Sequence, residues 1–81
     1  MSSVVIPMPK IHETAIIHPN AVLGKNVEIG PYAVIDEEVV IEQGCKVGEG
    51  NNVTVIGYHC VALENATVED GAMIYPDTIL H

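Results

Sequence analysis

An aliphatic side chain returns at every sixth position along most of this chain. The series starts at Ile11, runs unbroken to Val47 and resumes three residues late at Ile56. Its members are Ile11, Ile17, Leu23, Ile29, Ile35, Ile41, Val47, Ile56, Ala62, Val68, Ile74 and Leu80. Because apolar positions recur every 3.6 residues in an α-helix, a spacing of six does not predict helices.

A small residue stands two positions before each of these aliphatic residues from Ile17 onward. These residues are Ala15, Ala21, Val27, Ala33, Val39, Cys45, Thr54, Cys60, Ala66, Ala72 and Thr78. Side chains two positions apart in a strand point to the same side, so both members of each pair face inward. Glycine, asparagine, proline and aspartate crowd the positions between pairs, as turns require. Each six-residue unit is therefore predicted to be a short strand followed by a turn.

Three such units make one triangular coil of about 18 residues, and coils can stack at the ~4.8 Å spacing of neighbouring strands. The pattern predicts an all-β fold, a single-stranded parallel β-helix of about four triangular coils over residues 11–81. Residues 1–10, which contain two prolines, are expected to form an N-terminal cap segment. A chain of 81 residues leaves no room for a second domain.

The residue just before each core aliphatic residue must point outward, and these residues differ between the three sides of the triangle. The first column is polar and comprises Lys10, Glu28, Lys46 and Thr67. The second and third columns are apolar and comprise Ile16, Val34, Val55 and Met73, then Val22, Val40, Val61 and Ile79. Contiguous apolar surface of this kind marks an interface. A general preference of strands for branched residues would explain their presence but not their segregation by side.

Two different apolar sides on one prism suit a contact in which the second side of one copy packs against the third side of the next. Such contacts close into a ring when the rotation fits, and three triangular prisms close naturally. We therefore expect a homotrimer, with the corner between these two sides on its three-fold axis. The last coil ends in an open strand edge, which predicts end-to-end stacking of trimers.

The break in the six-residue spacing predicts a small loop within residues 49–53. Because Thr54 and Val55 fit their columns, the three extra residues fall at the corner between the first and second sides. Loops on a rigid scaffold often carry function, so this one is either a plain insertion or a substrate loop.

Composition excludes several classes of function. The net charge is −8 with three basic residues, which argues against binding to nucleic acid or to an anionic membrane. The two cysteines stand at inward positions and are expected to be small core residues rather than a disulfide framework. The start of the chain lacks the basic segment of a signal peptide, and no apolar run is long enough to span a bilayer. A cytoplasmic location is expected.

Two segments carry a resemblance to a known family. Residues 11–24 (IHETAIIHPNAVLG) and 27–32 (VEIGPY) resemble the amino-terminal coils of the UDP-N-acetylglucosamine acyltransferase family, within the hexapeptide-repeat acyltransferase superfamily. The resemblance extends from Ile11 to the last residue. It implies a left-handed helix, a homotrimer, and transfer of an acyl group from coenzyme A or acyl carrier protein to a sugar nucleotide or amine. It implies no tightly bound cofactor, because the acyl thioester is a co-substrate.

Histidine is the obvious general base for acyl transfer, because its pKa lies near neutrality. His59 is the candidate catalytic residue, since its turn position falls in one column with Asn20, Glu38 and Asp77. Glu38, His59 and Asp77 are thus expected to form an axial cluster in the trimer. Three interpretations of this cluster remain open: a charge network on the axis, a metal or ion site, and a catalytic base.

Other residues weaken the enzyme interpretation. The resemblance places Tyr58 where the family has its catalytic histidine, and Tyr58 and Leu63 where γ-class carbonic anhydrases have zinc ligands. No cysteine pattern predicts a metal site. His12 and His18 are expected to be solvated turn residues, and His81 to be mobile. The alternative to an acyltransferase is therefore a non-catalytic trimeric scaffold, or a truncated or designed solenoid.

Overall fold

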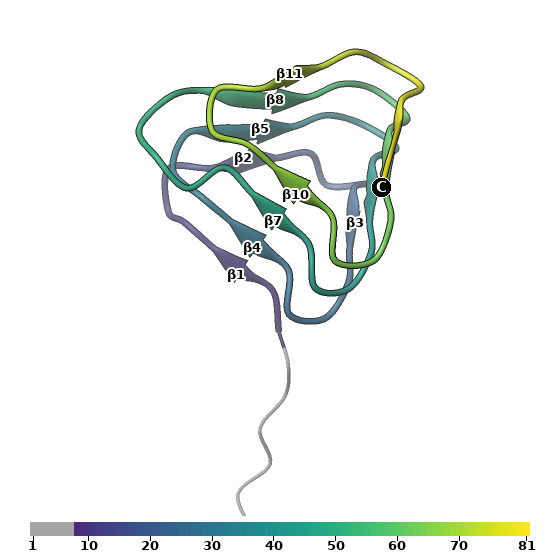
Figure 1. The fold of residues 1–81 in the computed structure, drawn as a ribbon, viewed down its shortest axis with the longest axis horizontal. Helices are drawn as coiled ribbons and strands as arrows, with labels where there is room; N and C mark the ends of the chain where they lie inside the picture. Colours follow the sequence, from purple (N-terminus) through teal and green to yellow (C-terminus); the bar gives the residue numbers. More distant parts are fainter. Residues whose placement is uncertain (1–7) are drawn as a thin grey trace, which may run out of the picture.

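The computed structural model describes residues 8–81, and within them the fold consists of short strands and turns without a helix (Figure 1). The strands follow one another around a triangle and each is two or three residues long. They are β1 (Lys10–Ile11), β2 (Ile16–Ile17), β3 (Val22–Leu23), β4 (Glu28–Ile29), β5 (Ala33–Ile35), β6 (Val40–Ile41), β7 (Lys46–Val47), β8 (Thr54–Ile56), β9 (Val61–Ala62), β10 (Thr67–Val68), β11 (Met73–Ile74) and β12 (Ile79–Leu80).

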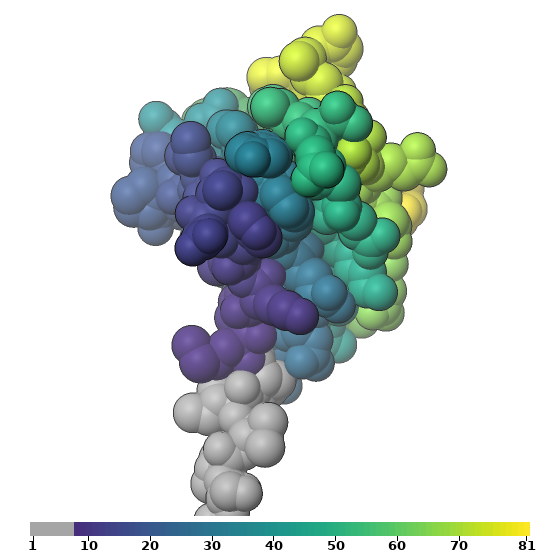
Figure 2. Space-filling view, turned by 90° about the vertical axis from the view of Figure 1, so that its left-hand side faces the viewer, coloured from purple at the N-terminus to yellow at the C-terminus, as the bar shows by residue number. Residues whose placement is uncertain are grey.

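Every third strand joins the same sheet, so three parallel sheets form the sides of a prism (Figure 1). The first face is β1-β4-β7-β10, the second face is β2-β5-β8-β11, and the third face is β3-β6-β9-β12. In the space-filling view, successive coils lie side by side as bands that change colour from purple to yellow (Figure 2). The predicted parallel β-helix of about four coils is confirmed, and its arrangement is consistent with a left-handed coil.

The structure places Lys10 in the first sheet, where it pairs with Glu28 of β4. The first strand of the β-helix therefore begins at Lys10, which is the last residue of the segment expected to be the cap. Of the other predicted cap residues, 1–7 lie outside the described residues. Within the described range no helix has the length and hydropathy that crossing a membrane requires.

The core is the predicted inward column, and its burial depends on position along the solenoid. Ile35, Ile41 and Ile56 in the middle coils are fully buried. Ile11 in the first coil is 46% exposed, and Leu80 in the last coil is only partly buried. Each coil covers only its neighbours, so within residues 8–81 the two ends of the stack leave part of the core open.

Cys45 and Cys60 are free thiols in this core, as the sequence predicts. The Sγ of Cys45 donates to the Leu63 carbonyl oxygen at 2.9 Å, and that of Cys60 to the Tyr75 carbonyl oxygen at 3.0 Å. Burial raises the pKa of the Cys45 thiol, because the thiolate loses its hydration. Both cysteines therefore fill space and satisfy carbonyl groups between coils.

The corners depend on residues with left-handed backbone conformation. Asn26, Tyr32, Glu38, His59, Asn65 and Asp77 have φ values between 57° and 63°. Such values are uncommon for residues other than glycine and cost of order 1 kcal/mol each or more. Neighbouring coils compensate with backbone hydrogen bonds, such as His59 N–H to the Glu37 carbonyl oxygen at 3.0 Å. The side chains at this turn position consequently stack along the corner from coil to coil.

The extra residues lie between β7 and β8, because β8 keeps the register Val34↔Val55 with β5. The loop is tied to the next coil. The Asn52 side chain donates to Asp70 Oδ2 at 2.8 Å, and the Gly71 N–H donates to Thr54 Oγ1 at 3.0 Å. The insertion is thus held against the solenoid at the corner that the columns predict.

Candidate functional site

The outward columns have the composition and register expected from the sequence. On the second face the outward residues are Ile16, Val34, Val55 and Met73, and on the third face Val22, Val40, Val61 and Ile79. The four valines of the middle coils are half-buried by their neighbours, whereas the terminal members are 58–67% exposed. The chain thus presents two unbroken apolar faces, and their burial in a trimer stays a prediction.

The second corner, the set of turns between the second and third faces, brings His59 against Asp77. His59 Nδ1 lies 2.9 Å from Asp77 Oδ1, and both side chains are largely exposed. A carboxylate only accepts hydrogen bonds, so in the neutral imidazole this contact places the proton on Nδ1 of His59 and the lone pair on Nε2. The ring therefore has the orientation that a general base needs.

Glu38 belongs to a different pair at the same corner. Asn20 Nδ2 donates to Glu38 Oε1 at 3.1 Å, and the Glu38 N–H donates to Asn20 Oδ1 at 3.1 Å. One asparagine amide thus satisfies both the backbone and the side chain of Glu38. The expected column divides into an Asn20–Glu38 pair and a His59–Asp77 pair.

His18 is also tied into the second corner. Its Nδ1 lies 2.7 Å from Asn20 Oδ1, and its Nε2 lies 3.6 Å from Glu37 Oε1. The Nδ1 atom is therefore engaged at the turn, and the side chain stays 38% exposed, in keeping with the turn residue that the sequence predicts. His18 connects the first two coils of this corner and is not oriented as a base.

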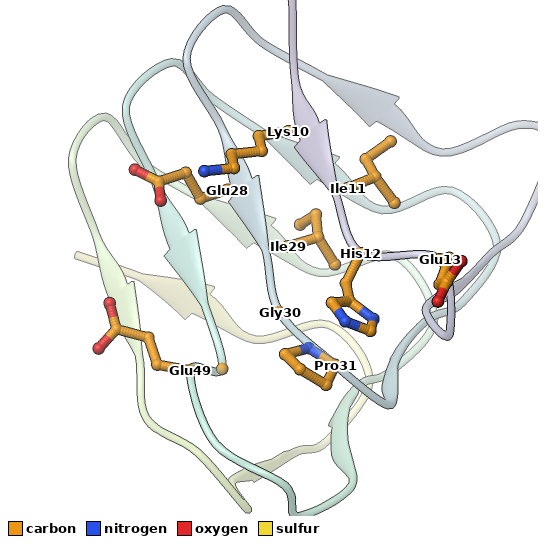
Figure 3. A pocket seen from close by; sticks show the side chains of 10 residues that line it. Lys10, Ile11, His12, Glu13, Glu28, Ile29, Gly30, Pro31 and Glu49 are labelled. Carbon is orange, nitrogen blue, oxygen red and sulfur yellow. The ribbon is translucent and has the colours of Figure 1, made fainter.

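The first corner, the set of turns between the first and second faces, carries a groove that the sequence did not reveal. The groove has a volume of about 600 Å³ and extends from the first face into this corner (Figure 3). Its apolar part is formed by Ile11, Ile29 and Pro31. Its charged part is formed by Lys10, Glu13, Glu28 and Glu49. The volume lies within the range of small-molecule sites, about 300–1,000 Å³.

Two glycines explain why there is space at this corner. Gly30 and Gly48 occupy the same turn position in consecutive coils, and a Cβ on Gly30 would collide with the Gly48 carbonyl oxygen. Side chains are therefore excluded there. His12 occupies this position in the first coil, and its ring lies beside Gly30 and Pro31 (Figure 3). The recurrence of His12, Gly30 and Gly48 at 18-residue intervals was the signal in the sequence that could have located the groove.

Hydrogen bonds fix the His12 ring as a wall of the groove. The Thr14 N–H donates to His12 Nδ1 at 3.2 Å, and the Thr14 hydroxyl lies 2.8 Å from the same nitrogen. The Tyr32 N–H in turn donates to Thr14 Oγ1 at 2.9 Å. Since Nδ1 accepts from Thr14, neutral His12 carries its proton on Nε2 and has no free lone pair for base catalysis.

Within residues 8–81, no three side chains of histidine, cysteine, aspartate or glutamate converge as metal ligands do. The described part of one chain therefore offers pairs of titratable groups and a groove. A site that combined residues from several copies would depend on the assembly.

The sequence profile of the bacterial transferase hexapeptide family (six repeats) matches residues 8–43 and again residues 21–55. Together the two matches cover more than half of the chain. The chain belongs to the bacterial transferase hexapeptide family. No curated protein matches it.

The residues that match the hexapeptide family include the groove at the first corner but not the His59–Asp77 pair at the second corner. The groove at the first corner lies within the matched residues, because its lining ends at Glu49. His59 and Asp77 lie beyond residue 55, in coils that continue the same repeat. Family membership therefore supports the fold, whereas the chemistry at the second corner is argued from geometry alone.

Proposed function

We propose that this protein is a homotrimeric acyltransferase that moves an acyl group from a coenzyme A or acyl carrier protein thioester to a sugar nucleotide or an amine. Membership of the hexapeptide family supports the class of reaction. The resemblance of residues 11–24 and 27–32 to the UDP-N-acetylglucosamine acyltransferases supports this choice of donor and acceptor. The observation that carries the proposal is the His59–Asp77 pair, in which one imidazole nitrogen is held by a carboxylate and the other is free.

In this mechanism the Nε2 of His59 removes the proton from the acceptor hydroxyl or amine as the acceptor attacks the thioester carbonyl. The tetrahedral intermediate then collapses, the carbon–sulfur bond breaks, and the departing thiolate recovers the proton from His59. Asp77 keeps the imidazole in the required tautomer and stabilises the imidazolium formed between the two steps. Positioned base catalysis of this kind contributes typically 10²–10⁴-fold to the rate.

The two apolar faces support the proposed trimer. When the second face of one copy packs on the third face of the next, the apolar outward residues of both faces are covered. They run from Ile16 to Met73 on the second face and from Val22 to Ile79 on the third. The first face keeps its polar column, in which Lys10, Glu28 and Lys46 alternate in charge, and stays in water. The second corner then faces the three-fold axis, and the three His59–Asp77 pairs come close to one another.

The test compares His59→Gln and Asp77→Asn with His12→Gln, whose ring is not oriented as a base. Thiol release from acetyl-coenzyme A and from a longer acyl thioester is followed with sugar-nucleotide and amine acceptors. Both second-corner variants should lose activity by about 10²-fold or more while remaining trimeric. His12→Gln should retain its activity. Full activity of His59→Gln would exclude this histidine as the base.

A non-catalytic trimeric scaffold is the second candidate, and one observation favours it. The His59–Asp77 pair lies between the two apolar faces, where a charge network could join three copies at the axis. This function predicts no binding of acetyl-coenzyme A at millimolar concentration. It also predicts that His59→Gln shifts the trimer–monomer equilibrium without any transfer activity to lose.

A further inference from the structure

The third sheet has an open edge at the start of the β-helix. Its strands follow the order β12-β9-β6-β3, so within residues 8–81 β3 has a neighbour on one side only. On β3, Val22 is 58% exposed and Leu23 is only partly buried, whereas Ile41, the partner of Leu23 on β6, is fully buried. An edge strand presents unpaired backbone groups, and here it also borders an incompletely covered core. A further strand of suitable sequence would complete both.

Residues 3–5 carry the pattern of such a strand, one coil before β3. Register partners in neighbouring coils, such as Val22 and Val40, stand 18 residues apart where no loop intervenes. Counting back 18 residues from Ala21, Val22 and Leu23 gives Ser3, Val4 and Val5. The segment thus supplies a small residue, an outward apolar residue and an inward aliphatic residue in the order that every unit of the third face shows. Val4 continues the apolar column of that face.

The first described residues already follow the coil that this pattern requires. The Lys10 N–H donates to the Val27 carbonyl oxygen at 2.7 Å. Met8 lines a hollow of about 280 Å³ together with Asn26, the residue 18 positions later. The chain therefore runs beside the next coil through the third corner, the set of turns between the third and first faces. From Met8 to Val5 the chain has the same length as from Asn26 back to the end of β3.

We propose that Val4 and Val5 add a strand to the open edge of the third sheet, parallel to β3, with Val5 over Leu23 in the core and Val4 beside Val22 on the surface. The occupant of the edge is thus the start of this chain. The proposal gives a definite register to the segment that the sequence predicts to be a cap. It goes beyond the proposed acyl transfer and does not depend on it.

The regular hydrogen bonding between coils specifies which backbone groups pair. One coil later, the Gly24 N–H donates to the Ile41 carbonyl oxygen at 2.7 Å. In the same pattern the Ile6 N–H, 18 residues before that of Gly24, donates to the Leu23 carbonyl oxygen. Bonds between parallel strands run evenly in both directions, so the Leu23 N–H donates to the Val4 carbonyl oxygen. Protection of the Leu23 amide is therefore a direct readout of the added strand.

The experiment is amide hydrogen exchange of the ¹⁵N-labelled 81-residue chain, followed by nuclear magnetic resonance. Ile17 is the matched internal control, because it occupies the position of Leu23 on the edge strand of the second sheet and no residue of this chain stands 18 positions before it. The amides of Leu23 and Ile6 should exchange about tenfold or more slowly than that of Ile17. Leu23 exchanging as fast as Ile17 would overturn the proposal. Equal protection of both would mean that another copy covers the whole end of the stack, and would overturn it as well.

Two variants test the register of the strand. Val5→Asp places a carboxylate in the core over Leu23 and should return the Leu23 amide to the exchange rate of Ile17. Ile6→Asp is the matched control and should keep the protection, because its turn position carries a glutamate, Glu42, two coils later. Neither variant alters residues 8–81, so far-ultraviolet circular dichroism should show the β-helix intact in both. Protection that survives Val5→Asp, or that Ile6→Asp removes equally, would show that the segment does not pair in this register.

Discussion

Replacing the same residue type in adjacent coils tests how the core of this solenoid is stabilised. Ile11 and Ile29 are register partners on the first face and occupy the same inward column. They differ in burial, because Ile29 is 3% exposed and Ile11 is 46% exposed. Ile29→Ala and Ile11→Ala therefore remove identical atoms from a covered position and from a half-open one.

The expected losses of unfolding free energy follow from this difference. Each removed methyl or methylene group contributes roughly 0.8 kcal/mol when fully buried, which gives about 2.4 kcal/mol for isoleucine to alanine. At Ile29 the surrounding coils also leave a cavity, and the total rises to about 3–4 kcal/mol. At Ile11 about half of the transfer contribution applies and solvent fills the space, so the loss is about 1–1.5 kcal/mol. A chain of this length is expected to have about 4–12 kcal/mol in total, so Ile29→Ala removes a large share.

The assay is urea unfolding followed by far-ultraviolet circular dichroism, at one fixed protein concentration because assembly adds to apparent stability. The slope of the unfolding free energy against urea concentration must be the same in both variants and the parent protein. Only then do differences in the unfolding midpoint report differences in stability. Equal losses for the two variants would refute the reasoning. They would mean that Ile11 is covered in solution, and that burial in this fold is not determined by the neighbouring coil alone.

Three further predictions concern assembly, close contacts and pH. Val34→Glu on the second face should dissociate the trimer, whereas Thr67→Glu on the first face should not, as measured by the molar mass from light scattering. A trimer that survives Val34→Glu would exclude the second face as the interface. Gly30→Ala should lower the melting temperature by more than ten degrees or prevent folding, because its Cβ would collide with the Gly48 carbonyl oxygen, and a native melting curve would contradict this. Burial raises the pKa of the Cys45 thiol, so the folded state holds that proton to higher pH than the unfolded state. The resulting stability is fully present below the unfolded value near 9.0 and declines as pH rises above it; urea midpoints across this range should fall less in Cys45→Ala.

The fold could be predicted because side-chain direction in a strand is set by the backbone. Inward and outward positions then follow from counting, and the columns from Lys10 to Thr67 and from Ile16 to Met73 appear in the structure in the expected register. The position of the loop followed in the same way. It was enough that Val55 resumes the apolar column of Val34.

The candidate site was predicted less completely, because contacts at the corners depend on side-chain rotamers and tautomers. Counting placed Glu38, His59 and Asp77 in one column, but Asn20 offers Glu38 both a donor and an acceptor and so holds it in a separate pair. The free Nε2 of His59 follows from a 2.9 Å contact that spacing alone does not determine.

The groove was missed for a related reason. It exists where Gly30 and Gly48 exclude side chains beside His12, an exposed turn residue, and its walls come from three different coils. Only the stacked structure shows that His12 lies over this space and that Thr14 fixes its ring.

The extra residues after Gly48 affect how successive coils align with one another when the chain folds. A perfect six-residue repeat is degenerate, since sliding one coil over the next by a single side would still place aliphatic residues inside. The insertion removes this ambiguity, because Asn52 meets Asp70, and Thr54 meets Gly71, in only one alignment of the coils. The few residues that break the periodicity thus fix the alignment of the coils, and with it the position of every other turn.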